Sequence, residues 1–171
     1  MDEGAAGAVV SLVLPSRPSY LALARVVIAD VAAAGPSLRD SRLADLRLIV
    51  SELYTNAMEA NWRATSARLR DEHDGVAPTR EAVLDASPPV QMRVRVGVHE
   101  VEIAVRDSGT GFVGGDDPHP PVGDPTRLDF ERGLGIPLVQ FLGDRVDYES
   151  GTDGTEATVL VRDGDGGHSA G

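Results

Sequence analysis

The chain of 171 residues contains no cysteine and no lysine. Without cysteine, the protein has no disulfide framework, no thiolate nucleophile and no thiolate metal site. Without lysine, it has no amine for a Schiff base, and it lacks the Gly-Lys-Ser/Thr ending of a Walker-type phosphate loop. Any phosphate that this protein binds must therefore be held by backbone amides, arginine or a metal ion.

Long apolar runs are also missing, and none approaches the length that crosses a membrane. The acidic N-terminus is not that of a signal peptide, so we expect a cytoplasmic protein. The formal net charge of -11 argues against direct binding to the nucleic-acid backbone. The four histidines are scattered and show no metal-ligand spacing. A chain of 171 residues with 42% hydrophobic composition fits one domain with a single core.

Hydrophobic periodicity predicts about five strands and about three helices. Strands are expected at 9–14, 92–98, 101–105, 145–150 and 155–161, and helices at 21–31, 38–62 and 136–142. Ser19 is expected to cap the first helix, and Asp40 or Ser41 the second. The predicted strands carry apolar side chains on one face, which indicates an α/β (α+β) two-layer sandwich. Its sheet would be mixed and mostly antiparallel, with helices covering one face.

The spacing of these elements does not match repeated βαβ units, which disfavours a Rossmann sheet. We expect one domain over residues 9–161, between flexible tails at 1–8 and 162–171. Residues 112–132 are rich in Gly, Pro and Asp and are too long for an ordinary connection. They indicate either a mobile functional loop or plain disorder.

Glu52 and Asn56 lie four residues apart on the long central helix, so their side chains share one face. A carboxylate can accept a proton, and a carboxamide oxygen can bind a hard cation. A solvated helix face gives the same spacing, so this pair alone does not identify a site.

Three later segments carry further small motifs. Asp107–Gly111 (Asp-Ser-Gly-Thr-Gly) follows an alternating strand, and Arg132–Gly135 (Arg-Gly-Leu-Gly) runs directly into a helix whose Pro137 suits its first turn. Gly154 and Thr155 open the last strand. Each of these three motifs alone fits an ordinary turn. Together with the Glu52 and Asn56 pair, however, they form a set of four motifs whose order along the chain is informative.

That order, Glu-x-x-x-Asn-Ala, Asp-x-Gly-x-Gly, Gly-Leu-Gly and Gly-Thr, resembles the boxes of the GHKL-type ATPases, which include gyrase, histidine kinases and MutL. The closer resemblance is to their anti-sigma factor serine/threonine-protein kinase branch, through residues 14–20, 45–52 and 55–57. The resemblance covers roughly residues 9–62 and 91–161. It implies a Bergerat-type ATP-binding fold and an ATP-dependent kinase that phosphorylates a serine of a STAS-domain anti-sigma antagonist. It also implies that the protein binds a sigma factor and works as a homodimer.

The resemblance gives roles to the residues of the first two boxes. Glu52 would be the catalytic base that takes the proton of the attacking hydroxyl. Asn56 would ligate Mg²⁺, which bridges the ATP phosphates and keeps waters as its other ligands. Asp107 would accept a hydrogen bond from the adenine amino group, and Gly109 and Gly111 would let the backbone approach the purine.

The last two boxes also have implied roles. The amides of Gly133, Leu134 and Gly135, with the dipole of the helix that follows, suit phosphate oxygens. Arg132 would reach the terminal phosphate, with Arg127 as its rival. Thr155 would bond the adenine side of the pocket or a nearby water.

Two stretches depart from the family pattern or extend it. Family members often carry histidine just after the asparagine box, where this chain has Ala60. They also join the central helix more directly to the next strand, so residues 63–89 are interpreted as an insertion, either a flexible surface loop or a partner contact. Residues 112–132, between the adenine and phosphate boxes, would be an ATP lid.

Other classes of protein give rival interpretations. One is a non-catalytic, nucleotide-dependent binding switch in a partner-switching regulatory system, but Glu52 argues against it because binding needs no base there. Another is the catalytic domain of a histidine kinase, but no helical pattern here carries a phosphoacceptor histidine. A third is a structural domain with accidental motifs, which four ordered boxes disfavour.

Overall fold

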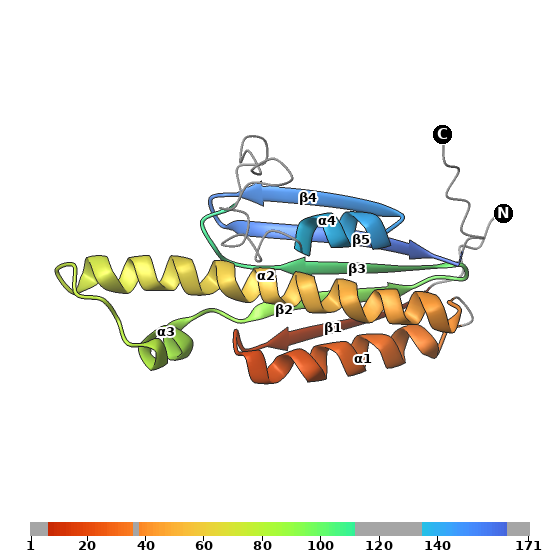
Figure 1. Ribbon diagram of the computed structural model, residues 1–171, viewed down its shortest axis with the longest axis horizontal. Coiled ribbons are helices and arrows are strands. Elements are labelled where there is room, and N and C mark those ends of the chain that lie inside the picture. Colours follow the sequence, from red (N-terminus) through yellow and green to blue (C-terminus); the bar gives the residue numbers. More distant parts are fainter. Residues whose placement is uncertain (1–6, 36–37, 112–134, 164–171) are drawn as a thin grey trace, which may run out of the picture.

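A computed structural model describes residues 7–35, 38–111 and 135–163 (Figure 1). In these ranges five strands form one sheet in the order β1-β2-β3-β5-β4, and all four pairings are antiparallel. The strands are β1 (Ala8–Leu14), β2 (Val90–Val96), β3 (Glu100–Arg106), β4 (Arg145–Gly151) and β5 (Gly154–Arg162). A 3-10 turn, η1 (Pro18–Tyr20), precedes the helices α1 (Leu21–Ala33), α2 (Asp40–Glu72), α3 (Arg80–Ala86) and α4 (Gly135–Leu142).

The helices α1, α2 and α4 lie side by side over one face of the sheet, while α3 lies beyond its end (Figure 1). This confirms the two-layer sandwich that the sequence predicts. Within the described ranges, none of the helices has the length and apolarity needed to cross a membrane.

The alternation of β2 determines which sheet face is buried. Val90, Met92, Val94 and Val96 are buried, and the residues between them are exposed. The buried face packs on the apolar stripes of the helices, whose largest fully buried side chains include Ile28, Leu46, Ile49 and Tyr54. The opposite face is charged and carries long ion pairs such as Arg93–Glu156 at 3.8 Å. Such exposed pairs add little to stability, so the apolar layer holds the two layers together.

Most of the stretch interpreted as an insertion is helical. α2 has 33 residues and continues to Glu72, which makes it about 50 Å long at 1.5 Å per residue. α3 follows, and its Thr79 cap accepts a hydrogen bond from the amide of Ala82 at 3.2 Å. The C-terminal part of α2 and the short helix α3 therefore form a helical pair outside the sandwich (Figure 1).

The capping predictions for the first two helices were wrong. Pro18 begins η1, which runs directly into α1, so the cap position falls at Tyr20 and not at Ser19. The α2 cap position is Arg39, with no capping bond from its own side chain. Instead, Asp163 accepts hydrogen bonds from the Arg39 amide at 3.2 Å and from its Nε at 2.9 Å. These hydrogen bonds lower the pKa of Asp163. The residue that follows β5 thus caps the N-terminus of α2.

Tyr54 ties α2 to the loop after β1. Its side chain is fully buried, and its hydroxyl lies 2.6 Å from the Pro15 carbonyl oxygen and 2.9 Å from that of Arg17. Burial raises the pKa of Tyr54. Stability from the neutral phenol is therefore present below its unfolded pKa of about 10 and is lost as pH rises through the folded value.

We expect Tyr54→Phe to lower the free energy of unfolding by about 0.5–1.5 kcal/mol, because it removes the hydrogen bonds to the Pro15 and Arg17 carbonyl oxygens, each of which keeps a backbone amide donor. Urea denaturation at neutral pH measures this change. Tyr20→Phe is the matched control, since that hydroxyl bonds no described residue, and it should stay within about 0.5 kcal/mol of wild type. Equal loss in both variants would contradict the role given to the Tyr54 hydroxyl.

Candidate functional site

The first residue of α4 lies directly against Glu52 and Asn56 of α2. A Cβ atom added to Gly135 would lie 2.6 Å from Glu52 Oε2, and 3.4 and 3.5 Å from Asn56 Nδ2 and Oδ1. Both side chains are half-buried, and Gly135 is buried. A helix N-terminus carries free amides and partial positive charge. The fold therefore brings a carboxylate, a carboxamide and an anion-binding helix end together at one point.

Asp107 ends β3 with its carboxylate held by the neighbouring backbone. Its Oδ1 accepts hydrogen bonds from the Gly109 amide at 2.8 Å and the Thr155 amide at 3.2 Å. Its own amide donates to the Thr155 carbonyl oxygen at 3.0 Å. The side chain is 7% exposed, and its Oδ2 makes no hydrogen bond to any described residue. One oxygen thus orients the carboxylate and leaves the other to accept from a ligand.

Glycine is required where the β4–β5 turn meets the Asp107 loop. Gly154 has a φ of +121°, and a Cβ there would lie 2.1 Å from the Asp107 carbonyl oxygen. Gly111 has a φ of +80°, and a Cβ there would lie 2.1 Å from the Gly151 carbonyl oxygen. Two backbone segments distant in sequence therefore touch, and both are predicted boxes.

Ala60 of α2 packs against Gly109 of the loop that follows Asp107. A Cβ at Gly109 would come within 3.1 Å of the Ala60 Cβ and 3.2 Å of its carbonyl oxygen. The position where family members often carry histidine therefore supports the Asp107 loop in this chain. Ala60 is four residues after Asn56 on α2, about 6 Å further along the helix axis. One helix thus contacts both parts of the site.

Asn61 is a site residue that sequence reasoning missed. It is fully buried, and its Oδ1 accepts a hydrogen bond from the Ser108 amide at 2.7 Å. Its Nδ2 donates to Ser16 Oγ at 3.0 Å and to the Pro88 carbonyl oxygen at 3.1 Å. Asn61 therefore braces the residue between Asp107 and Gly109. The available signal was a polar residue four positions after Ala57 on an otherwise apolar helix stripe.

The other predicted residues fall into two groups. Thr155 is beside the Asp107 carboxylate, and its hydroxyl lies 3.1 Å from Ser150 Oγ. Arg132, Gly133, Leu134, the rival Arg127 and the lid expected at 112–132 lie outside the described residues. The predicted site residues that are described form two groups. One group contains Glu52, Asn56 and Gly135, and the other contains Asp107, Gly109, Gly111 and Thr155.

Asn56 is the candidate metal ligand, and the described residues offer few other donors near it. The described part of the chain holds no group of three or more His, Cys, Asp or Glu side chains that could bind a metal. A single carboxamide oxygen nevertheless fits Mg²⁺, which usually takes its remaining ligands from phosphates and water. Asn56 would therefore hold a metal ion only together with a phosphate ligand.

Comparisons with known proteins identify the family of the chain. The sequence matches the family described as histidine kinase-like ATPase domain over residues 14–161. A similar solved structure contains the RsbU and RsbW domains of Rv1364c from Mycobacterium tuberculosis, with a TM-score of 0.55 and 17% identity. That match covers 91% of this chain and 32% of the other, so this chain spans about a third of that structure.

A second similar structure is the histidine kinase domain of the Erythrobacter litoralis EL346 blue-light activated histidine kinase. It has 22% identity and a TM-score of 0.46, and the match covers 85% of this chain and 60% of the other. No curated protein sequence matches the chain. The family match spans far more than half of the sequence and includes every box described above, so the chain belongs to the histidine kinase-like ATPase domain family.

Proposed function

We propose that this protein is a cytoplasmic anti-sigma factor and an ATP-dependent protein serine kinase. It would bind a sigma factor and phosphorylate a serine of a STAS-domain antagonist. The observation that supports this most is the meeting of Glu52 and Asn56 with the first residue of α4. The motif resemblance at residues 14–20 and 45–57 supports the anti-sigma branch of the family.

ATP would bind with its adenine at Asp107 and its phosphates toward α4. The adenine amino group would donate to Asp107 Oδ2, the oxygen that bonds no described residue. The backbone near Gly109 and Gly111 would lie along the purine, and the N-terminal amides of α4 would receive phosphate oxygens. Mg²⁺, held by Asn56 and the phosphates, would supply charge neutralisation during transfer.

Phosphoryl transfer would then depend on Glu52. The serine hydroxyl oxygen would attack the terminal phosphorus, the bond to the bridging oxygen of ADP would break, and Glu52 would take the hydroxyl proton. A protein that only binds a nucleotide needs no carboxylate at this position. Glu52 therefore favours the kinase over the non-catalytic switch.

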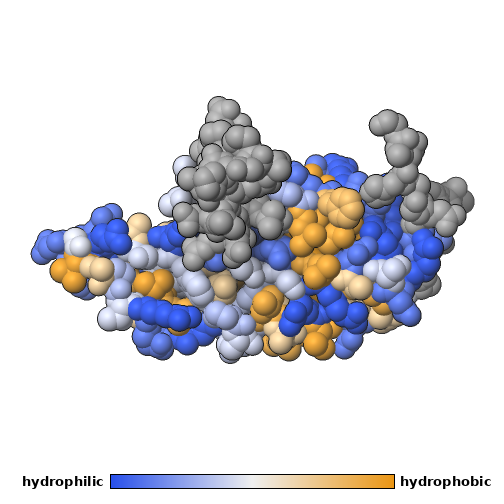
Figure 2. Space-filling model, in the orientation of Figure 1, coloured by the Kyte–Doolittle hydropathy of each residue, from blue (hydrophilic) through white to orange (hydrophobic). Residues whose placement is uncertain are grey.

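Exposed apolar side chains are candidates for the partner surfaces. Figure 2 shows apolar side chains gathered over α4 and the adjoining part of α2, and others along α1. Phe141 of α4 is 68% exposed, and Leu23 and Val26 of α1 are 46% and 56% exposed. β1 is an edge strand beneath α1, so this edge with α1 would form the homodimer contact. The patch over α4 would then remain for the sigma factor or the antagonist.

Transfer of the labelled terminal phosphate from Mg²⁺-ATP to STAS-domain proteins of the same genome tests the proposal. We expect one of these proteins to be labelled on serine, and its Ser→Ala variant to stay unlabelled. A pulldown with each sigma factor, with and without ATP, tests the second activity. ATP binding without transfer to any STAS-domain protein would favour the binding switch instead.

A further inference from the structure

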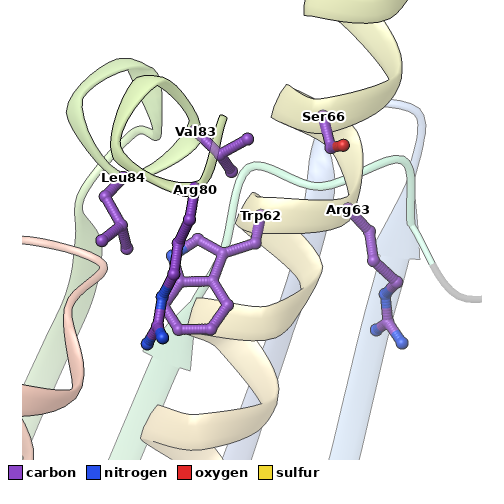
Figure 3. A pocket seen from close by; sticks show the side chains of 6 residues that line it. All are labelled: Trp62, Arg63, Ser66, Arg80, Val83 and Leu84. Atoms are coloured by element: carbon purple, nitrogen blue, oxygen red, sulfur yellow. The ribbon is translucent and has the colours of Figure 1, made fainter. Parts of the chain in front are cut away.

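A groove lies between α3 and the C-terminal part of α2, outside the site described above (Figure 3). Trp62, Arg63 and Ser66 line it from α2, and Arg80, Val83 and Leu84 from α3. Its volume is about 280 Å³. This is just below the range of pockets that hold whole small ligands, roughly 300–1,000 Å³. The groove is therefore suited to one or two side chains.

Hydrogen bonds and ion pairs hold both walls of the groove in place. Trp62 Nε1 donates to the Ser16 carbonyl oxygen at 2.7 Å. On α3, Asp85 forms an ion pair with Arg17, and Glu81 lies 3.7 Å from the same guanidinium. Because these contacts anchor both helices to the loop after β1, a ligand would meet a preformed surface.

The two charged residues that line the groove are both arginines. Arg63 and Arg80 are exposed, and neither forms an ion pair or side-chain hydrogen bond with any described residue. Figure 3 shows the Arg80 side chain beside the Trp62 ring, whereas the Arg63 side chain extends away from that ring. By contrast, Arg17 and Arg68 both pair with carboxylates nearby. In a chain with net charge -11, two arginines without an ion-pair partner among the described residues form a local basic site beside apolar side chains.

We propose that this groove binds an acidic, amphipathic segment of a partner protein. A large apolar side chain of the segment would lie between Trp62 and the Val83 and Leu84 side chains. Carboxylates on either side of it would pair with Arg63 and Arg80. Tryptophan and arginine are the residues that most often dominate the binding energy of such contacts. Two cations on an acidic chain are too few to hold a nucleic-acid backbone, so a protein segment is the better fit.

This inference goes beyond the kinase activity and does not depend on phosphotransfer or on ATP. It gives the 63–89 stretch a function as a contact surface. Trp62 is the only tryptophan of the chain, so its fluorescence reports directly on the groove.

A library of random 16-residue peptides displayed on phage, selected on the folded full-length protein, tests the proposal. We expect the selected peptides to carry a large apolar residue flanked by Asp or Glu, and to shift the emission of Trp62 on binding. The double variant Arg63→Glu/Arg80→Glu should bind them about 10-fold more weakly or worse, and rising salt should weaken wild-type binding. Arg47→Glu/Arg70→Glu is the matched control, since it changes the net charge equally at exposed residues outside the groove, and it should retain affinity.

Thermal melts verify that both double variants fold, and Arg80→Gln replaces the first if it does not, with a weaker affinity still expected. The proposal is overturned if no peptide is selected, if the selected peptides lack acidic residues, or if the groove variants bind as wild type does. A change of Trp62 emission with protein concentration alone would show a second copy of the chain in the groove, and would also overturn it.

Discussion

Glu52→Gln should lower the rate of phosphoryl transfer by about 10²–10⁴-fold, the usual loss when a general base is removed. Gln is nearly isosteric with Glu but accepts no proton at neutral pH. The Gln amide would occupy the place of the Glu52 carboxylate beside Gly135. Glu52 Oε2 lies 2.6 Å from where a Cβ atom on Gly135 would be. ATP affinity should therefore change little. Single-turnover transfer to the cognate STAS-domain protein, with ATP affinity measured in parallel, separates the two effects.

Other variants in the same region distinguish a base from a metal ligand. Asn56→Ala should weaken Mg²⁺-dependent ATP binding together with the rate, because it would remove the proposed protein ligand of the metal. Gly135→Ala should lower the rate by displacing the Glu52 side chain. Glu72→Gln, at the exposed end of the same helix, is the matched control and should behave as wild type. Equal transfer by wild type and Glu52→Gln would remove the role given to Glu52.

Local patterns in the sequence predicted most of the fold. The alternation of Met92, Val94 and Val96 predicted both the strand and its buried face, and the structure confirms both. Pro137 and the glycines before it predicted a helix start, and α4 begins at Gly135. These features depend on residues close together in the chain, so hydrophobic periodicity and turn chemistry are sufficient to find them.

Features that depend on distant contacts could not be predicted in this way. The acceptor for the Arg39 amide is Asp163, which is 124 residues away, so local sequence could not predict this cap. The bridge from Asn61 to Ser108 likewise needs the packing of α2 against the end of β3. The groove beside Trp62 forms only because α3 folds back onto α2. The sequence predicted the Asp107 loop and the start of α4 as separate motifs. Tertiary packing brings both of them to α2.

Asp107→Asn should weaken ATP binding by about 10- to 100-fold while leaving the fold nearly intact. The Asn Oδ1 can still accept from the Gly109 and Thr155 amides, which Asp107 Oδ1 bonds at 2.8 and 3.2 Å. The Oδ2 position, however, becomes an NH₂ group, which would present a donor instead of an acceptor to the adenine amino group. Loss of one hydrogen bond to a charged group costs about 1.5–3 kcal/mol, which corresponds to a loss of this size.

Thermal melts with added nucleotide measure this directly. Mg²⁺-ATP and ADP should both raise the melting temperature of wild type, because a ligand of the folded state stabilises it by mass action. At the same nucleotide concentrations, Asp107→Asn should show a much smaller rise, and its melting temperature without nucleotide should stay near that of wild type. Asp147→Asn, an exposed acid on β4, serves as the control and should retain the full rise. An undiminished rise in Asp107→Asn would place the adenine elsewhere. If wild type does not respond to millimolar ATP, nucleotide binding by this chain is ruled out, and the kinase proposal with it.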